Sequence, residues 1–182
     1  MGMQEGGCQM LISEKYKKLN IELHQSNEIF GNGGDKWLFK IQQLAKETNS
    51  ESILDYGCGK GKLIHTLKEQ GFEVQGYDPA VEEWDNYSIC KVDMVVCCDV
   101  LEHVEEEFVA STLDKLKELS RKAFFAVIAL RLSNKVFSNG ENTHITLLSA
   151  EEWMERLLKR FVKGERLPWK NPNKLLFEWS KR

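Results

Sequence analysis

The 182-residue sequence has few of the features that mark membrane, secreted or fibrous proteins. No apolar run approaches the ~18–20 residues that span a bilayer, and the longest, residues 123–130, has the length of a buried strand. The N-terminus has no cationic stretch followed by an apolar core, so we expect no signal peptide. Only three prolines are present, and no repeat or low-complexity segment is visible. We therefore expect a cytoplasmic globular protein without a membrane partner.

Cysteine is scarce and unpatterned. The five cysteines are an odd number, with no CxxC pair and no zinc-like spacing. Cys97 and Cys98 are adjacent in an apolar run, where successive side chains of a strand point to opposite faces. Reduced thiols in a reducing compartment therefore fit the sequence better than disulfides.

A strong charge of either sign is also absent, because the net charge is only −3, which does not suggest a nonspecific nucleic-acid binder. The charge is nevertheless uneven along the chain. Residues 82–107 hold nine acids and one base, whereas residues 155–182 hold nine bases and three acids. Two interpretations stay open: two solvated faces of opposite sign, or a basic C-terminal part that meets an anionic substrate.

The first third of the sequence predicts two helices around a glycine-rich loop. Residues 12–22 have helix-forming content, and residues 36–47 carry apolar side chains at helical spacing. Between them, the cluster GNGG at residues 31–34 predicts a loop. Asp35 is the expected N-cap of the second helix.

From residue 52 the pattern alternates between strands and helices. We expect helices at residues 62–70 and 108–121, and a third that begins at a capping box formed by Ser149 and Glu152. The strand-forming runs lie at residues 52–56, 73–77, 94–98, 123–130, 162–167 and 175–180.

Strands separated by helices imply βαβ units and a mostly parallel sheet between helical layers. The last two strands would close this sheet as a C-terminal antiparallel hairpin. The predicted fold class is therefore α/β. We place an N-terminal helical cap segment at residues 1–34 and a single domain at residues 35–182. Ligands of such sheets bind at the carboxyl ends of the strands, here residues 55–61, 77–79 and 97–103.

The strongest chemical signal is the segment LDYGCGKG at residues 54–61. Its three alternating glycines let the backbone turn sharply and lie against a ligand, and the following helix points its first N–H groups at that ligand. Asp78 lies 21 residues beyond Gly57, where an acid at the end of a second strand commonly binds ribose hydroxyls. The pattern predicts a nucleoside across the two strand ends, rather than a plain glycine-rich turn with a solvated acid.

The spacing also favours one kind of nucleoside. A dinucleotide fingerprint requires glycine at position 62, where Lys62 stands, and a P-loop requires glycine and Ser or Thr where Tyr56 and Leu63 stand. Asp55, two residues before the first glycine, would repel a pyrophosphate but can bind an ammonium group. S-adenosylmethionine carries such an ammonium, a sulfonium and a ribose, so we expect it as the cofactor.

Residues 53–61, 76–79 and 98–104 resemble motifs of class I S-adenosylmethionine-dependent methyltransferases, over about residues 35–160. The YGCGKG variant, preceded by residues 23–24 and 30–31, is similar to a small group of phage-type methyltransferase-domain proteins. The resemblance implies a three-layer Rossmann-like fold and transfer of a methyl group to a small-molecule O or N acceptor. The cofactor-binding residues that it implies are Asp55, Tyr56, Gly57, Cys58, Gly59, Gly61, Asp78, Pro79 and Asp99.

One segment departs from the family. The family usually has a third strand followed by an acid near the adenine, but only about 14 residues separate Pro79 from Met94. We expect that strand to be very short or absent. Asp85 is a candidate for the adenine amino group, and backbone contacts are an equal alternative.

A second group of candidate residues follows the 94–98 strand. Asp99 stands where the family places a residue facing the methyl donor and acceptor, and His103 lies on the same side of a helical turn. We predict both as catalytic, with His103 accepting a proton from the acceptor. The alternative is that Glu102 and His103 only cap and orient the turn.

The same segment resembles the E-x-x-E-H metal-binding motif of small-RNA 3′-terminal 2′-O-methyltransferases and some ubiquinone-pathway O-methyltransferases. Asp99 replaces the first Glu, and His144 is the only downstream histidine that completes the set. Carboxylates and imidazoles suit Mg²⁺, Mn²⁺ or Zn²⁺. Because one ligand is changed and the second half of the motif is not recognisable, we expect no metal.

The N-terminal segment of many such enzymes closes over the cofactor, which makes His24 and Tyr16 candidate substrate residues. The basic C-terminal part keeps an RNA or DNA acceptor as the alternative to a small molecule. A noncatalytic S-adenosylmethionine-binding module is the third interpretation, since the cofactor motifs alone do not distinguish binding from turnover.

Overall fold

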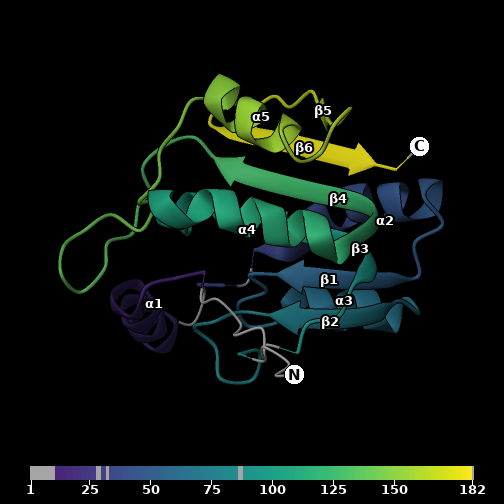
Figure 1. The fold of residues 1–182 in the computed structure, drawn as a ribbon. Helices are drawn as coiled ribbons and strands as arrows, with labels where there is room; N and C mark the ends of the chain where they lie inside the picture. The colour runs from purple at the N-terminus through teal and green to yellow at the C-terminus, as the bar shows by residue number, and fades with distance from the viewer. Residues whose placement is uncertain (1–10, 28–29, 32, 86–87, 182) are drawn as a thin grey trace, which may run out of the picture.

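A six-stranded sheet in the order β2-β1-β3-β4-β6-β5 runs through the centre of the computed structural model, which describes residues 11–27, 30–31, 33–85 and 88–181. The first four strands of this order are parallel, β6 pairs antiparallel with β4, and β5 pairs antiparallel with β6, so the predicted C-terminal hairpin is present. The arrowheads of β1, β2 and β4 point to the side of the molecule where α1 lies (Figure 1). The strands are β1 (Ser52–Tyr56), β2 (Glu73–Tyr77), β3 (Val92–Cys98), β4 (Ser120–Ala129), β5 (Glu165–Arg166) and β6 (Lys174–Ser180).

Helices cover both faces of the sheet and make three layers, with α4 in front of the sheet in Figure 1 and α2 and α3 behind it. None of the described helices has the length and apolarity needed to cross a membrane. The helices are α1 (Glu14–Ser26), η1 (Gly34–Trp37), α2 (Leu38–Glu47), α3 (Lys62–Glu69), η2 (Leu101–His103), α4 (Glu106–Leu119) and α5 (Ala150–Leu158).

The central strands feed two separate cores because successive side chains point to opposite faces. In β3, Met94 and Val96 pack under α2 and α3, whereas Val95 and Cys97 pack under α4 and α5. All four side chains are fully buried. Burial on both faces explains why these strands read as continuous apolar runs.

Two predicted helix boundaries are wrong, the start of α2 and the end of α4. Asp35 is not the N-cap of α2 but lies inside the 3-10 turn η1, and its carboxylate pairs with Lys62 instead (2.6 Å). The predicted helix 108–121 ends earlier, because Ser120 takes an extended backbone and donates its hydroxyl to Leu116 O (2.7 Å). Strand β4 therefore begins at Ser120, three residues before the predicted start.

The predicted strand 162–167 is also wrong, since only Glu165–Arg166 pairs with β6. Lys163 has a left-handed backbone (φ 66°), and a side chain at Gly164 would lie 2.1 Å from Phe177 Cζ. The chain therefore turns tightly before it can pair. The structure confirms the remaining predicted strands and the capping box of α5. It also has no strand in the described part of residues 78–91, as expected.

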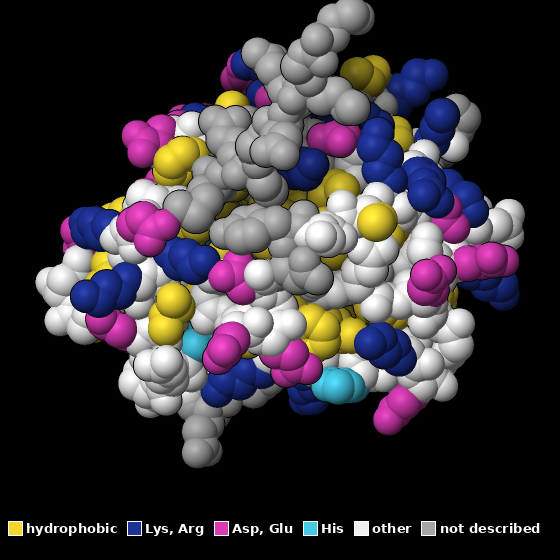
Figure 2. Space-filling view, turned by 60° about the horizontal axis from the view of Figure 1, so that its bottom comes forward, with side chains coloured by type: hydrophobic (Ala, Val, Ile, Leu, Met, Phe, Trp, Pro, Cys, Tyr) yellow, Lys and Arg dark blue, Asp and Glu magenta, His cyan; other side chains and the backbone are white. Residues whose placement is uncertain are grey.

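The acidic and basic segments of the sequence do not form separate faces. Arg156 pairs with Glu106 (2.6 Å), and Lys174 pairs with Asp99, so the basic C-terminal part meets the acidic segment inside one molecule. On the face shown in Figure 2, Lys and Arg side chains lie interspersed with Asp and Glu. The division at residue 34 into a cap segment and a domain stays a prediction.

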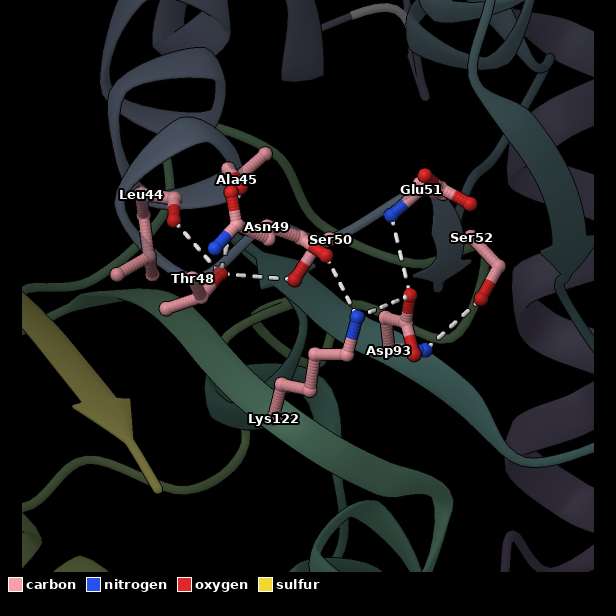
Figure 3. Close-up of polar contacts among 9 residues, drawn as sticks. All are labelled: Leu44, Ala45, Thr48, Asn49, Ser50, Glu51, Ser52, Asp93 and Lys122. Carbon is pink, nitrogen blue, oxygen red and sulfur yellow. Dashed lines mark hydrogen bonds and ion pairs between the residues drawn. The ribbon is translucent and has the colours of Figure 1, made fainter. Parts of the chain in front are cut away.

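A polar cluster ties the amino ends of three strands together, at the edge opposite to the strand carboxyl ends (Figure 3). Asp93 of β3 accepts hydrogen bonds from Glu51 N (3.1 Å) and Lys122 Nζ (2.9 Å), and its own N–H donates to Ser52 Oγ. Lys122 also donates to Asn49 O (2.5 Å). Burial opposes the ionisation of Asp93, but the donors outweigh it, and its pKa lies below the ordinary value.

We expect Asp93→Ala to lower the free energy of unfolding by about 2 kcal/mol, because it removes hydrogen bonds from a charged acceptor. A carboxyl whose folded pKa is depressed contributes stability above its ordinary pKa and loses it as the pH falls through the folded value. The difference between wild type and variant should therefore shrink in strong acid. Urea unfolding at neutral and acidic pH measures both effects.

Glu118→Ala is the matched control, because Glu118 forms an exposed pair with Lys115 (3.2 Å). Such a pair contributes at most about 1 kcal/mol. Equal losses in the two variants at neutral pH would contradict the structural role of Asp93.

Candidate functional site

A cavity of about 530 Å³ opens at the carboxyl ends of the parallel strands, within the usual size range of small-molecule sites. The chain reverses its strand order here, because β1 pairs with β2 on one side and β3 on the other. Such a switch point is where open α/β sheets bind ligands. All three segments that the sequence singled out, after β1, β2 and β3, contribute residues to the cavity wall.

The glycine loop after β1 is fixed to β2, since Gly57 N donates to Tyr77 O (2.7 Å). Gly57 has φ 76°, and a Cβ there would lie 2.3 Å from Val100 Cγ2. A Cβ at Gly59 would lie 2.4 Å from Gly31 O. At both positions, atoms of the protein already occupy the space that a Cβ would need. These contacts alone therefore require glycine.

Asp55, near the end of β1, is 4% exposed and lines the cavity. No hydrogen bond or ion pair from the described residues reaches its carboxyl group. Burial, with a smaller contribution from the nearby Asp78, raises the pKa of Asp55 to about 7. A cationic group in the cavity would favour the charged carboxylate.

Asp78 follows β2 directly and joins the glycine loop to its own turn. Its Oδ2 accepts from Gly59 N (2.9 Å) and its Oδ1 from Ala80 N (2.9 Å). Burial raises the pKa of Asp78 in spite of these donors. Each carboxylate oxygen has a second lone pair, so both remain able to accept a ribose hydroxyl.

Asp99 follows β3 with a left-handed backbone (φ 57°), and its N–H donates to Val127 O (2.8 Å). Its carboxylate lies between two lysines, contacting Lys36 Nζ (2.7 Å) and Lys174 Nζ. Burial opposes ionisation, but the two cations outweigh it and hold the pKa of Asp99 below the ordinary value. Asp99 is therefore ionised and lines the cavity in a cationic setting.

Glu102, His103 and His144 form a cluster whose possible ligand atoms all lie within 4.8 Å of one another. Glu102 is fully buried, and its Oε1 accepts from Ala129 N (3.0 Å). Its Oε2 has no partner among the described residues. Burial, followed by the charge of Asp99, raises the pKa of Glu102 to about 8.

Both histidines of this cluster are fixed by backbone carbonyls. His103 Nδ1 lies 2.7 Å from Thr143 O, and His144 Nδ1 lies 2.6 Å from Arg131 O. A carbonyl only accepts, so Nδ1 of each ring is the donor and Nε2 keeps its lone pair. Burial lowers the pKa of His103 to about 4, with His144 adding to the shift, so His103 is neutral.

This arrangement fits a divalent cation. Backbone carbonyls that hold Nδ1 of metal-binding histidines are the usual outer shell of such sites, and the free Oε2 of Glu102 supplies a carboxylate. Asp99, which the resemblance offered as a further ligand, is instead paired with lysines.

Some of the other predicted site residues line the cavity and some do not. His24 lines the cavity and packs its ring on Phe30 (4.7 Å between centroids). Tyr16 is not among the cavity residues; its hydroxyl donates to Glu141 (3.1 Å). Asp85, the adenine candidate, is also outside the cavity lining and pairs with Lys17 (2.7 Å). Of the predicted cofactor residues, only Gly61 is not in the lining, which holds Asp55, Tyr56, Gly57, Cys58, Gly59, Asp78, Pro79 and Asp99.

Sequence reasoning missed Lys36, Arg131 and Lys174, which all line the cavity. Lys36 and Lys174 are 63 and 75 residues from Asp99 in the chain, so no local spacing connects them. The excess of bases in residues 155–182 was the only signal for Lys174.

Comparison with known proteins assigns the chain to a family. A family model described as a methyltransferase domain matches residues 33–161. A ubiquinone biosynthesis O-methyltransferase of Rickettsia bellii is 28% identical over an alignment of 104 residues, and the match covers 43% of this chain and 42% of that protein. The chain thus matches less than half of the length of the curated relatives.

Two solved structures share the fold. An S-adenosylmethionine-dependent methyltransferase from Clostridium acetobutylicum superposes with a TM-score of 0.61 at 13% identity, covering 91% of this chain and 97% of that one. The 1,6-didemethyltoxoflavin-N1-methyltransferase of Burkholderia thailandensis, solved with its substrate and S-adenosylhomocysteine, gives 0.59 at 16% identity, covering 95% and 92%. The chain belongs to the methyltransferase-domain family and has the Rossmann-like fold of class I S-adenosylmethionine-dependent methyltransferases.

Proposed function

We propose that this chain binds S-adenosylmethionine and transfers its methyl group to an O or N atom of a small molecule. The observation that carries the proposal is Asp55, a buried carboxyl that lines the cavity beside the glycine loop without a partner among the described residues. The ammonium of the cofactor's amino acid part supplies the missing positive charge. Asp78, one strand away, accepts hydrogen bonds from the ribose.

When bound, S-adenosylmethionine supplies an activated methyl group, so the protein mainly has to align the acceptor and exclude water. Asp99 and His103 line the same cavity on the β3 side of Asp55. His103 presents a neutral Nε2 that can accept a proton from the acceptor. Its pKa of about 4 makes it a weak base, which suits an acceptor that sheds its proton as the new bond forms.

The named relatives support a small acceptor. The curated relative is named for ubiquinone biosynthesis and O-methylation, and the toxoflavin enzyme for N-methylation of a small heterocycle. Incubation with labelled methyl donor and fractionated cell extract tests the proposal. Label in a small-molecule fraction supports it, label in nucleic acid contradicts the acceptor class, and cofactor binding without any labelled fraction favours a noncatalytic module.

The cytoplasm is the compartment that we propose for this reaction. The four described cysteines, Cys58, Cys90, Cys97 and Cys98, are all free. Burial raises the pKa values of the Cys58, Cys97 and Cys98 thiols, so they stay protonated and unreactive. Free thiols next to the cofactor loop fit a reducing compartment.

A second candidate function is metal-assisted transfer to a hydroxyl, favoured by the Glu102, His103 and His144 cluster. A divalent cation held there would supply Lewis-acid chemistry near the acceptor. The comparisons do not indicate a metal, so this candidate depends on the cluster alone.

We expect Asp55→Asn to weaken S-adenosylmethionine binding about tenfold or more, because an amide cannot pair with an ammonium as a carboxylate does. The same change should stabilise the ligand-free protein at about pH 8 by at least about 1 kcal/mol. The folded pKa of about 7 lies above the ordinary 3.8, so the wild type loses stability as the pH rises between these values and the variant does not. Calorimetric titration and thermal unfolding at two pH values measure both effects.

Asp114→Asn is the control, since Asp114 lies on α4 in a surface pair with Arg160 (2.8 Å). It should leave cofactor affinity unchanged. An Asp55→Asn variant that binds the cofactor like the wild type would refute the assignment of the ammonium to Asp55.

The metal-assisted candidate requires that calorimetric titration with Mn²⁺ show one site in the wild type. His144→Ala should weaken it about tenfold or more, because it removes one of three ligands. His65→Ala, an exposed histidine on α3, is the matched control. No Mn²⁺ binding in the wild type, or equal binding in both variants, removes this candidate.

A further inference from the structure

The charges that line the cavity change sign along the sheet edge. Asp78 and Asp55 lie at the ends of β2 and β1, and Asp99 follows β3. Arg131 then follows β4, and Lys174 begins β6. Because β6 is antiparallel, its first residue reaches the same edge as the last residues of the other strands.

The β4–β6 side of the cavity has an excess of positive charge. Lys36 and Lys174 share one carboxylate, Asp99. Among the described lining residues, the other acid on this side is Glu102, which forms no ion pair. Counted with Arg131, the two lysines outnumber these two acids, so this side keeps a net positive charge.

Arg131 adds a further positive charge. Its guanidinium donates to Leu132 O (2.9 Å) and Asn134 Oδ1 (3.2 Å), and no carboxylate of the described residues pairs with it. The side chain is exposed, so it can turn its remaining donors toward a ligand. The amides of Asn134, Asn171 and Asn173 line the same part of the cavity and can donate hydrogen bonds.

This cationic part is adjacent to the reacting groups. The carbonyl of Arg131 holds His144, whose ring lies against His103 (4.8 Å between centroids). Lys174 contacts Asp99 directly. An anion bound by Arg131 and Lys174 would therefore bring the rest of its molecule next to Asp99 and His103.

We propose that the methyl acceptor carries an anionic group, a carboxylate or a phosphate, which binds between Arg131 and Lys174. This inference rests on the proposed function, because it assigns the acceptor part of the same cavity. Arginine is suited to the role, since its planar donors pair with both oxygens of a carboxylate or phosphate.

Binding of simple probes to the full chain saturated with S-adenosylhomocysteine tests the proposal. We expect benzoate and phenyl phosphate to bind and the uncharged benzamide to bind at least about tenfold more weakly than benzoate. The tighter of the two anions shows which anionic group the site prefers. Ligand-observed NMR at millimolar probe concentration measures the affinities, and no turnover is needed.

Arg131→Gln should weaken binding of the preferred anion about tenfold while S-adenosylhomocysteine affinity stays unchanged. Arg121→Gln is the matched control, because Arg121 is exposed near the start of β4, at the end opposite to the one that Arg131 follows. Benzamide binding equal to benzoate, or no loss in Arg131→Gln, overturns the proposal.

Two outcomes distinguish an anionic small-molecule acceptor from failure of the proposed function and from a nucleic-acid acceptor. Failure of S-adenosylhomocysteine to bind refutes the proposed function. In that case, the binding of benzoate and phenyl phosphate to the ligand-free chain still tests the anion site. An Arg131-dependent affinity for a short single-stranded oligonucleotide, with none for phenyl phosphate, overturns the small-molecule assignment in favour of a nucleic-acid backbone.

Discussion

Two carboxyl groups buried at neighbouring strand ends, Asp55 and Asp78, constrain the rest of the site. The parallel register of β1 and β2 pairs Asp55 with Gly76 and Tyr56 with Tyr77, so both acids reach the same edge. Backbone N–H groups of the glycine loop and the next turn satisfy Asp78, but no described residue satisfies Asp55. A buried acid without a counter-charge raises the free energy of the folded state. The ligand-free fold therefore favours any cation that enters this end of the cavity.

The other end of the cavity has the opposite requirement, and one topological feature produces it. Strand β6 runs against its neighbours, so it starts at the edge where β3 and β4 end and brings Lys174 to Asp99. A parallel strand in this place would have put its final residue there instead. The charge of the cavity lining thus changes from acids at the ends of β2 and β1 to bases beside β4 and β6. A cationic methyl donor would prefer the acidic end, and an anionic methyl acceptor the basic end.

Local patterns account for what the sequence predicted correctly, and nonlocal contacts account for what it missed. The glycine loop, the capping box of α5 and the alternation in β3 depend on residues a few positions apart. The predicted strand 162–167 is wrong because the chain turns at Lys163, whose backbone is left-handed, and local spacing did not show that Gly164 packs against Phe177 of the paired strand β6. Asp35 looked like an N-cap, but its partner is Lys62, beyond the following strand. The pairing of Lys36 and Lys174 with Asp99 could not be predicted from spacing, since 63 and 75 residues separate them from Asp99 in the chain.

The geometry of His103 separates the two candidate functions of its cluster. Thr143 O fixes Nδ1 as the donor, which leaves a single lone pair on Nε2. That lone pair can accept a proton from the acceptor or bind a cation, but not both at once. A bound cation would also ionise Glu102, which is mostly protonated without one. Base catalysis by His103 and metal assistance are therefore mutually exclusive states of the same three side chains, and occupancy by a cation decides between them.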